Sequence, residues 1–297
     1  MGEPTALAGR IWKHRSDYLF IAPGYFVFLG FMLMPLLYAV GLSFYRTSFN
    51  LSAKVFIGFG QYQRLFQDPV FLKALVNTVL YTFIIVPLTL FVSLFIALAI
   101  DPLHNRLQAF FRAAFYMPTV AGGVVLSIVW LWILNPTYGL LNYVLGWFEV
   151  DPVSWLASAP ESFWAVCLVV LTFTVGEPII LFLAGLAAIP QELIDSAVVE
   201  GASNFQITLR IRLPLIRPVM LFILATQTIR VFQLWEVIFM LTQGGPYNSS
   251  TSLVFLIYQT AFIAARYGKA SAIGVILLLI IFVVTLMQIR LWKESDL

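Results

Sequence analysis

Three ionisable residues interrupt long apolar runs of this sequence: Glu177, Arg230 and Glu236. An ionised side chain at the centre of a bilayer costs about 2.5–3.5 kcal/mol on insertion scales, so such a residue indicates a functional site. Glu177 and Arg230 lie near the middle of their runs, and we expect them to pair because they lie at similar depth. Two interpretations stay open: an ion pair that joins two helices, or the polar lining of a translocation cavity.

Arg230 must find this partner on another helix. Gln227, Arg230 and Gln233 are spaced three apart and lie on one broad helix face. Glu236 is six positions beyond Arg230 and points about 120° away from it on an ideal helix. Pro178 follows Glu177 and favours a kink, as expected where a helix lines a cavity.

The sequence predicts neither catalytic nor metal-binding residues. His14 and His104 lie in segments predicted to be cytoplasmic, and the single cysteine, Cys167, lies in an apolar run. They form no cluster with catalytic or metal-ligand spacing. The Gly268-Lys269 pair lacks the preceding glycine of a phosphate-binding loop. We therefore expect this chain to hold no cofactor itself.

The composition is that of a membrane protein. Of the 297 residues, 61% are hydrophobic and 10% are charged, whereas soluble domains carry roughly 25% charged residues. The net charge of +3 comes from cations scattered over tails and loops, which excludes a nucleic-acid partner. Several tryptophans, including Trp235, could stack on a sugar, although most of them are expected in an interfacial aromatic belt.

Six runs reach the length of about 20 residues that a bilayer crossing needs. They must be helical, because lipid offers the backbone no hydrogen-bond partner. We predict an all-α integral membrane protein with a single six-helix domain over 18–291 and tails at 1–17 and 292–297. A seventh run, 251–265, is too short to cross and is expected at the membrane interface. The six spans are 18–45, 74–100, 113–134, 162–189, 218–241 and 270–289.

The distribution of cations predicts the orientation. Six spans place both termini on the same side, where ten Lys and Arg residues lie, against six on the other side. By the positive-inside rule both termini are cytoplasmic. The extracytoplasmic segments are then 46–73, 135–161 and 243–269.

A long cytoplasmic segment, the 190–217 loop, connects spans four and five. Pro190 favours a helix start, Gly201 a break, and Ser203 or Asn204 a cap for a second helix that should stop before Pro214. Small residues around Gly201 allow another surface to come close. Periodicity alone leaves two interpretations open: a docking element, or an amphipathic loop on the lipid surface.

The residue pattern of the 190–217 loop resembles the EAA loop of ABC-importer permeases. That loop has the form Glu-Ala-Ala, three residues, Gly, nine residues, Ile-x-Leu-Pro. Here Asp and Ser replace the usual Glu and Ala, and Glu200 replaces the usual Asp, with charge or size kept. The matching residues are Asp195, Ser196, Ala197, Glu200, Gly201, Ala202, Ile211, Leu213 and Pro214.

Similarity to the sugar-permease branch extends over most of the chain. This resemblance implies a type I ABC-importer permease fold in which the short helix before Gly201 is a coupling helix. It also implies residues of the substrate pathway before the segments 182–186 and 241–246. With the polar residues above, the expected pathway set is Gly176, Glu177, Gln227, Arg230, Val231, Gln233, Leu234 and Glu236.

The resemblance further implies the partners. They are a second, homologous permease, two cytoplasmic P-loop ATPase subunits that bind ATP and Mg, and an extracytoplasmic solute-binding protein. The expected function is uptake of a sugar or sugar-like solute across the bacterial cytoplasmic membrane, by a subunit with no ATPase activity of its own. Two alternatives stay open: a secondary transporter with Glu177 and Arg230 as an ion relay, or an importer of a phosphorylated solute such as glycerol phosphate.

Overall fold

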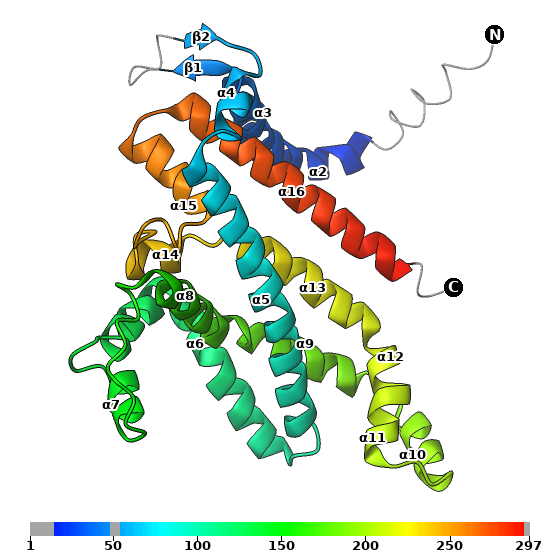
Figure 1. Ribbon diagram of the computed structural model, residues 1–297. Coiled ribbons are helices and arrows are strands. Elements are labelled where there is room, and N and C mark those ends of the chain that lie inside the picture. The colour runs from blue at the N-terminus through cyan, green and yellow to red at the C-terminus, as the bar shows by residue number, and fades with distance from the viewer. Residues whose placement is uncertain (1–14, 48–53, 294–297) are drawn as a thin grey trace, which may run out of the picture.

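A computed structural model describes residues 15–47 and 54–293, and the predicted tails lie largely outside these residues. The chain is a bundle of long helices with one two-stranded hairpin at its end (Figure 1). The first part contains α2 Arg15–Val27, the π-helical turn η1 Phe28–Leu33, α3 Met34–Leu42, β1 Tyr45–Thr47, β2 Lys54–Phe56, α4 Gly60–Leu65, α5 Pro69–Ile100, α6 Asn105–Ile133, α7 Leu140–Gly146, α8 Ala159–Thr174 and α9 Gly176–Ala187. The second part contains α10 Gln191–Val199, α11 Asn204–Ile207, η2 Thr208–Arg212, α12 Leu213–Leu215, α13 Arg217–Phe232, α14 Glu236–Leu241, α15 Leu253–Tyr258, η3 Gln259–Ile263 and α16 Tyr267–Lys293.

The six predicted spans correspond to helices of this bundle. Within the described part of the chain, five stretches are long and apolar enough to cross a membrane, and the sixth span is the pair α8 and α9, which meet at a bend of 42°. The second and third spans begin earlier than predicted, at Pro69 and Asn105, because the helices continue through Lys73 and Arg112. Asp68 accepts a hydrogen bond from the backbone of Val70 and thereby caps α5.

The short run 251–265 forms α15 and η3, which are too short to cross the membrane, as predicted. Its first part is buried, because Leu253, Phe255 and Leu256 pack within the bundle, whereas Phe262 and Ile263 are exposed. Leu253 and Leu256 join a cluster with Phe71 of α5 and Ile273 of α16. Burial of these leucines anchors the short helix to the bundle.

Helix α5 runs through the centre of the molecule and contributes to all three apolar clusters (Figure 1). At its N-terminal part Phe71 packs under α15 and α16. In the middle Tyr81 and Ile85 pack against α8 and α14, and at the C-terminal end Ile100 packs against α9 and α13. The 32 residues of α5 therefore form a surface against which other spans pack.

Polar side chains of α5 hold the connection between α14 and α15. The amide nitrogen Nδ2 of Asn77 lies within hydrogen-bonding distance of three backbone carbonyl oxygens of this connection, at 3.0–3.1 Å. The Tyr81 hydroxyl donates to a fourth carbonyl, and Thr78 Oγ1 accepts from the backbone of Leu253. Because buried carbonyls need partners, these side chains determine where the connection lies.

An ion pair joins the N-terminal ends of α5 and α16. Lys269 Nζ lies 2.6 Å from Asp68 Oδ2, and each side chain is about one quarter exposed. Burial acts to raise the pKa of Asp68, but the hydrogen bonds from Lys269 and Val70 and the charge of Lys269 outweigh it, so the pKa lies below its ordinary value. The ionised form is therefore favoured in the folded chain.

Asp68→Asn is expected to lower the melting temperature of the detergent-solubilised protein at neutral pH. Because the folded pKa of Asp68 is depressed, the stabilisation by this pair is complete above the unfolded pKa and is lost as the pH falls through the folded value, below about 4. The difference in melting temperature between wild type and Asp68→Asn should therefore shrink in acid. A difference that stays constant down to the acid end of the titration would contradict this account.

Candidate functional site

Two helices approach each other closely at the bend between α8 and α9, which lies just before Pro178. Gly176 is buried, and a Cβ atom at this position would clash with the backbone carbonyl oxygen of Phe115 on α6. Thr119 of α6 donates a hydrogen bond to the backbone oxygen of Phe173, just before the bend, at 2.9 Å. The bend places Glu177 in the first turn of α9, where the helix dipole favours a negative charge.

The fifth span is not one continuous helix, contrary to the predicted run 218–241. Helix α13 ends at Phe232 and α14 begins at Glu236. The break leaves backbone groups without their helical partners. One of them, the carbonyl of Leu234, accepts a hydrogen bond of 2.6 Å from Ser252, whose hydroxyl also caps α15. Non-helical backbone at membrane depth needs such partners from the protein.

The break changes the direction of Glu236. An ideal helix would turn Glu236 away from Arg230, but in the structure both residues line one hollow of about 260 Å³. We call it the polar hollow. Gly123 of α6 leaves the space that Glu236 occupies, since a Cβ atom there would lie 2.6 Å from Glu236 Oε2. The lining residues are Phe173, Arg230, Gln233, Leu234, Trp235, Glu236 and Val237.

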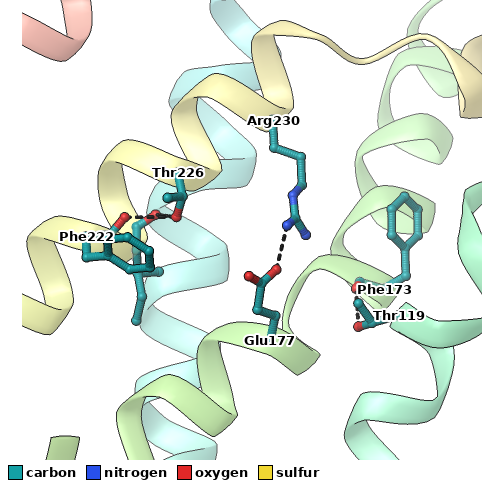
Figure 2. Close-up of polar contacts among 7 residues, drawn as sticks. Thr119, Phe173, Glu177, Phe222, Thr226 and Arg230 are labelled. Atoms are coloured by element: carbon teal, nitrogen blue, oxygen red, sulfur yellow. Dashed lines mark hydrogen bonds and ion pairs between the residues drawn. The ribbon is translucent and has the colours of Figure 1, made fainter. Parts of the chain in front are cut away.

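Arg230 and Glu177 form the ion pair that the sequence predicts. Figure 2 shows the guanidinium of Arg230, from α13, pointing at the carboxylate of Glu177, from α9. Arg230 Nη2 lies 2.5 Å from Glu177 Oε2, and the two side chains are 43% and 37% exposed. The pair therefore connects two spans and is also accessible beside the polar hollow. The exposure favours a lining role, while the contact is compatible with either interpretation.

The other residues of the expected pathway divide into two groups. Gln233, Leu234 and Glu236 reach the polar hollow. Gly176 lies at the bend, while Gln227 and Val231 are buried within the bundle. Gln227 Oε1 is buried without a hydrogen-bond partner among the described residues. The structure thus gathers Glu177, Arg230, Gln233, Leu234 and Glu236 and leaves Gln227 and Val231 in the interior.

Two aromatic residues complete the polar hollow. Trp235, one of the tryptophans for which the sequence left open a belt position or stacking on a sugar, lies in the break, and its ring stacks on Phe239 with a centroid distance of 5.1 Å. Phe173 comes from the end of α8. No sequence signal separated Phe173 from the other apolar residues of its span, because its place in the lining depends on the packing of α8 against other helices.

The 190–217 loop projects from the opposite end of the bundle to the β1–β2 hairpin (Figure 1). Helix α10 ends at Val199, and Gly201, two residues later, has φ of +83°. The backbone N–H of Ala202 donates to Ala197 and that of Gly201 donates to Val198, the pattern of a Schellman C-cap. Ser203 then caps α11 in a capping box with Gln206, as its sequence position predicts.

One predicted boundary in this loop is wrong. The second helix does not stop before Pro214 but continues as the π-helical turn η2 and then α12, with Pro214 near the start of α12. The backbone N–H of Leu213 donates to Thr208, five residues back. This wider turn shifts the hydrogen-bond register, so the missing N–H of proline interrupts the helix less than in a regular α-helix.

The surface of the loop combines apolar and charged groups. Val199 is 88% exposed and Phe205 is 71% exposed. Apolar side chains that other parts of a protein cover are exposed far less than this. Ala197 and Ile207 are buried where α10 meets α11. The remaining residues of the EAA-like pattern are exposed or half-buried: Asp195, Ser196, Glu200, Gly201, Ala202, Ile211, Leu213 and Pro214.

An ion pair that the sequence did not predict ties this loop to the rest of the bundle. Arg212 Nη1 lies 3.2 Å from Asp101 Oδ2, in the turn between α5 and α6. In the EAA-like pattern Arg212 occupies the unspecified position, and Asp101 lies more than a hundred residues earlier. Only the folded chain brings the two charges together.

Comparisons with known proteins agree with this architecture. The family model described as binding-protein-dependent transport system inner membrane component matches residues 55–291. The chain is 30% identical to the trehalose/maltose transport system permease protein MalF of Thermococcus litoralis, covering 94% of each chain. It is 30% identical to the sulfoquinovosyl glycerol transport system permease protein SmoG of Agrobacterium fabrum, covering 94% of this chain and 90% of that one.

A solved structure shares the fold. It is a chain from the crystal structure of a bacterial ABC transporter involved in the import of the acidic polysaccharide alginate, with a TM-score of 0.85 and 24% identity. The match covers 97% of this chain and 99% of that chain. The described helices are therefore arranged as in that solved structure, at both ends of the bundle.

The ion pair is expected to contribute little to folding stability, because exposed pairs are worth about 0–1 kcal/mol. Arg230→Ala and Glu177→Gln should each change the melting temperature of the solubilised protein only slightly, and the double variant should match their sum. Thr226→Ala is the control, since its hydroxyl bonds only to carbonyls of its own helix. Large losses in both single variants that the double variant recovers would instead identify a structural pair.

Proposed function

Because the chain belongs to the family of inner membrane components of binding-protein-dependent transport systems, we propose that it is the permease subunit of an ATP-driven importer of a sugar or sugar-like solute. The chain is a multi-pass protein of the inner membrane with the fold of a type I ABC-importer permease. The solute classes proposed are disaccharides, oligosaccharides, glycosides and polyols.

The observation that carries the ATP-driven mechanism is the geometry of the 190–217 loop. Exposed apolar residues on α10 and α11, such as Val199 and Phe205, form a surface suited to a groove on a cytoplasmic partner. From η2 the chain runs through α12 directly into α13, and Arg212 holds this segment on the α5–α6 turn. A displacement of α10 would therefore be transmitted to α13, which carries Arg230.

This connection suggests how the permease changes the side of the membrane to which its pathway opens. We propose that two ATPase subunits bind the coupling helices. The ATP-driven closure of these subunits would move the coupling helices toward each other. ATP and Mg are bound by those subunits. This chain transmits the movement and has no ATPase activity of its own. Movement of α13 relative to α9 would separate Arg230 from Glu177 and alter the polar hollow beside them.

The residues of the polar hollow suit a neutral, hydroxyl-rich solute. Trp235 and Phe173 offer aromatic surface for the apolar face of a sugar ring, while Arg230, Gln233 and Glu236 offer hydrogen-bonding groups. Two carboxylates, Glu177 and Glu236, lie near the single guanidinium of Arg230. This balance disfavours a phosphorylated solute such as glycerol phosphate. The names of two relatives, which transport trehalose or maltose and sulfoquinovosyl glycerol, support the sugar class.

The proposed assembly contains a second, homologous permease, two cytoplasmic ATPase subunits and an extracytoplasmic binding protein, all in or on the lipid bilayer. Six spans supply half of a pathway, and the exposure of Arg230 and Glu177 is consistent with a further helix bundle facing them. Both termini are proposed to be cytoplasmic from the excess of cations on that side. A secondary transporter would have no use for the 190–217 loop.

The subunit composition of the complex tests this proposal. Gentle solubilisation from the native membrane, followed by mass measurement of the intact complex, should recover this chain with a P-loop ATPase in two copies and a different permease of similar size. The same preparation identifies the binding protein, as the soluble protein that stimulates ATP hydrolysis. Recovery of the chain alone or as a simple dimer would overturn the proposal in favour of a secondary transporter.

Gly201→Val should uncouple transport from ATP hydrolysis. The positive φ of Gly201 disfavours a β-branched residue, although the space around its Cα is open, so the change acts through backbone conformation. We expect a loss of solute uptake of about tenfold or more, from a cost of about 1–2 kcal/mol in the C-cap of α10, with membrane insertion unchanged.

Gly201→Asn is the matched control, because asparagine tolerates a left-handed conformation. It should retain most of the uptake measured in proteoliposomes. Equal activity of Gly201→Val and wild type would show that the conformation of this turn does not matter for coupling.

A further inference from the structure

Four cationic side chains converge on a second hollow, at the outer end of the bundle. It has a volume of about 330 Å³ and is lined by Arg46, Thr47, Gln61, Arg64, Arg266 and Lys269. We call it the cationic hollow. Its charges come from three separate elements, β1, α4 and the start of α16, so the tertiary structure alone assembles it. Arg46, Arg64 and Arg266 are all exposed.

The backbone around the cationic hollow is held in place by buried contacts. Thr47 Oγ1 accepts a hydrogen bond of 3.0 Å from the backbone of Gly268, and Gln61 Nε2 donates to the carbonyl oxygen of Tyr45. Thr47 and Gln61 are both buried. Gly268 has no Cβ, which lets the backbone of Tyr45 lie directly against α16. These contacts position the cations before any partner arrives.

The positive charge of the cationic hollow is largely uncompensated. Lys269 pairs with Asp68. Within residues 15–47 and 54–293, no carboxylate forms an ion pair with Arg46, Arg64 or Arg266. The segments 46–73 and 243–269 together contain six cations, and their single acidic residue is Asp68. Grouped like charges that face water produce a potential which attracts an anionic ligand.

The cationic hollow opens at the end of the bundle and not on its lipid-facing flank. Lys269 lies one turn before Ile273, on the same side of α16. Ile273 is fully buried in the cluster with Phe71 of α5. The exposed apolar residues of α16, such as Leu279 and Phe282, lie further along the helix on another side. The hollow is therefore above the packed core, where a protein outside the membrane can reach it.

Charge is distributed unevenly over the predicted outer segments. The segment 135–161 carries Glu149, Asp151 and Glu161 and no Lys or Arg, the reverse of the cationic segments. In Figure 1, α7 of this segment lies well apart from the β1–β2 hairpin beside the cationic hollow. A docked partner with an acidic and a basic region would therefore be held in one orientation.

We infer that the cationic hollow receives an acidic loop of the extracytoplasmic binding protein, with Arg46, Arg64 and Arg266 binding its carboxylates. This inference rests on the proposed function. Arginine suits this role because its planar guanidinium donates two parallel hydrogen bonds to one carboxylate. The contact would set the affinity and the orientation of docking, at a distance from the polar hollow and from the 190–217 loop.

The test uses the intact importer, purified from its native membrane and placed in nanodiscs of phosphatidylcholine. The probe is the binding protein identified by its stimulation of ATP hydrolysis. The Arg64→Glu/Arg266→Glu double variant should raise the half-saturating concentration of binding protein by about tenfold or more and leave the maximal ATPase rate unchanged. If this variant does not assemble, Arg64→Gln/Arg266→Gln is measured in the same way.

Lys73→Glu is the matched control. Lys73 is an exposed cation of the segment 46–73 that does not line the cationic hollow. Its reversal should raise the half-saturating concentration by no more than about twofold, through long-range attraction alone. An Arg266→Lys variant adds a direct readout, because a carbodiimide joins the introduced amine to a carboxylate in contact with it. The cross-linked peptide should contain an Asp or Glu of the binding protein.

Three results would overturn the inference and leave the proposed function standing. They are an unchanged half-saturating concentration in the double variant, an equal rise in Lys73→Glu, and an effect that arises only in nanodiscs containing phosphatidylglycerol. The last result would identify a lipid phosphate as the occupant. If no binding protein stimulates even the wild-type complex, the proposed function itself fails.

Discussion

Every backbone N–H and C=O inside a bilayer needs a hydrogen-bond partner within the protein, and this constraint governs where the helices of this chain are interrupted. Among the described residues, interruptions of the spans include the bend before Gly176, the break between Phe232 and Glu236, and the non-helical Gly122 within α6. The bend and the break border the polar hollow. The carbonyl of Leu234 finds its partner in Ser252, from a segment beyond the break. At this break the protein itself supplies the hydrogen bond that irregular backbone needs in a membrane.

Helix α5 supports the bundle around these interruptions. It contributes to each apolar cluster and holds the α14–α15 connection through Asn77 and Tyr81. Ion pairs lie at both of its ends, Asp68 with Lys269 and Asp101 with Arg212. Through these pairs one helix is tied at one end to a residue of the cationic hollow, Lys269, and at the other to the 190–217 loop. The proposed docking, translocation and coupling functions are separate surfaces on a shared support.

Several features could be predicted because they depend on local sequence. The lengths of the apolar runs predicted six spans, and similar depth predicted the pair between Glu177 and Arg230. Gly201 and Ser203 could be assigned because capping depends on a few adjacent residues. The resemblance of the 190–217 loop to an EAA loop, together with the matches elsewhere along the chain, led to the family that the comparisons then showed.

Other features were decided by contacts between distant segments. The sequence alone determined which residues are apolar enough to lie in lipid, which charges interrupt them, and where local helix ends occur. The tertiary structure decided that Glu236 lines the same hollow as Arg230, that the first part of 251–265 is buried, and that four cations meet at one end of the bundle. The physical reason is that hydropathy and capping act over a few residues. A break, a bend or a charged hollow instead depends on which helix supplies the missing hydrogen bond, the space or the neighbouring charge.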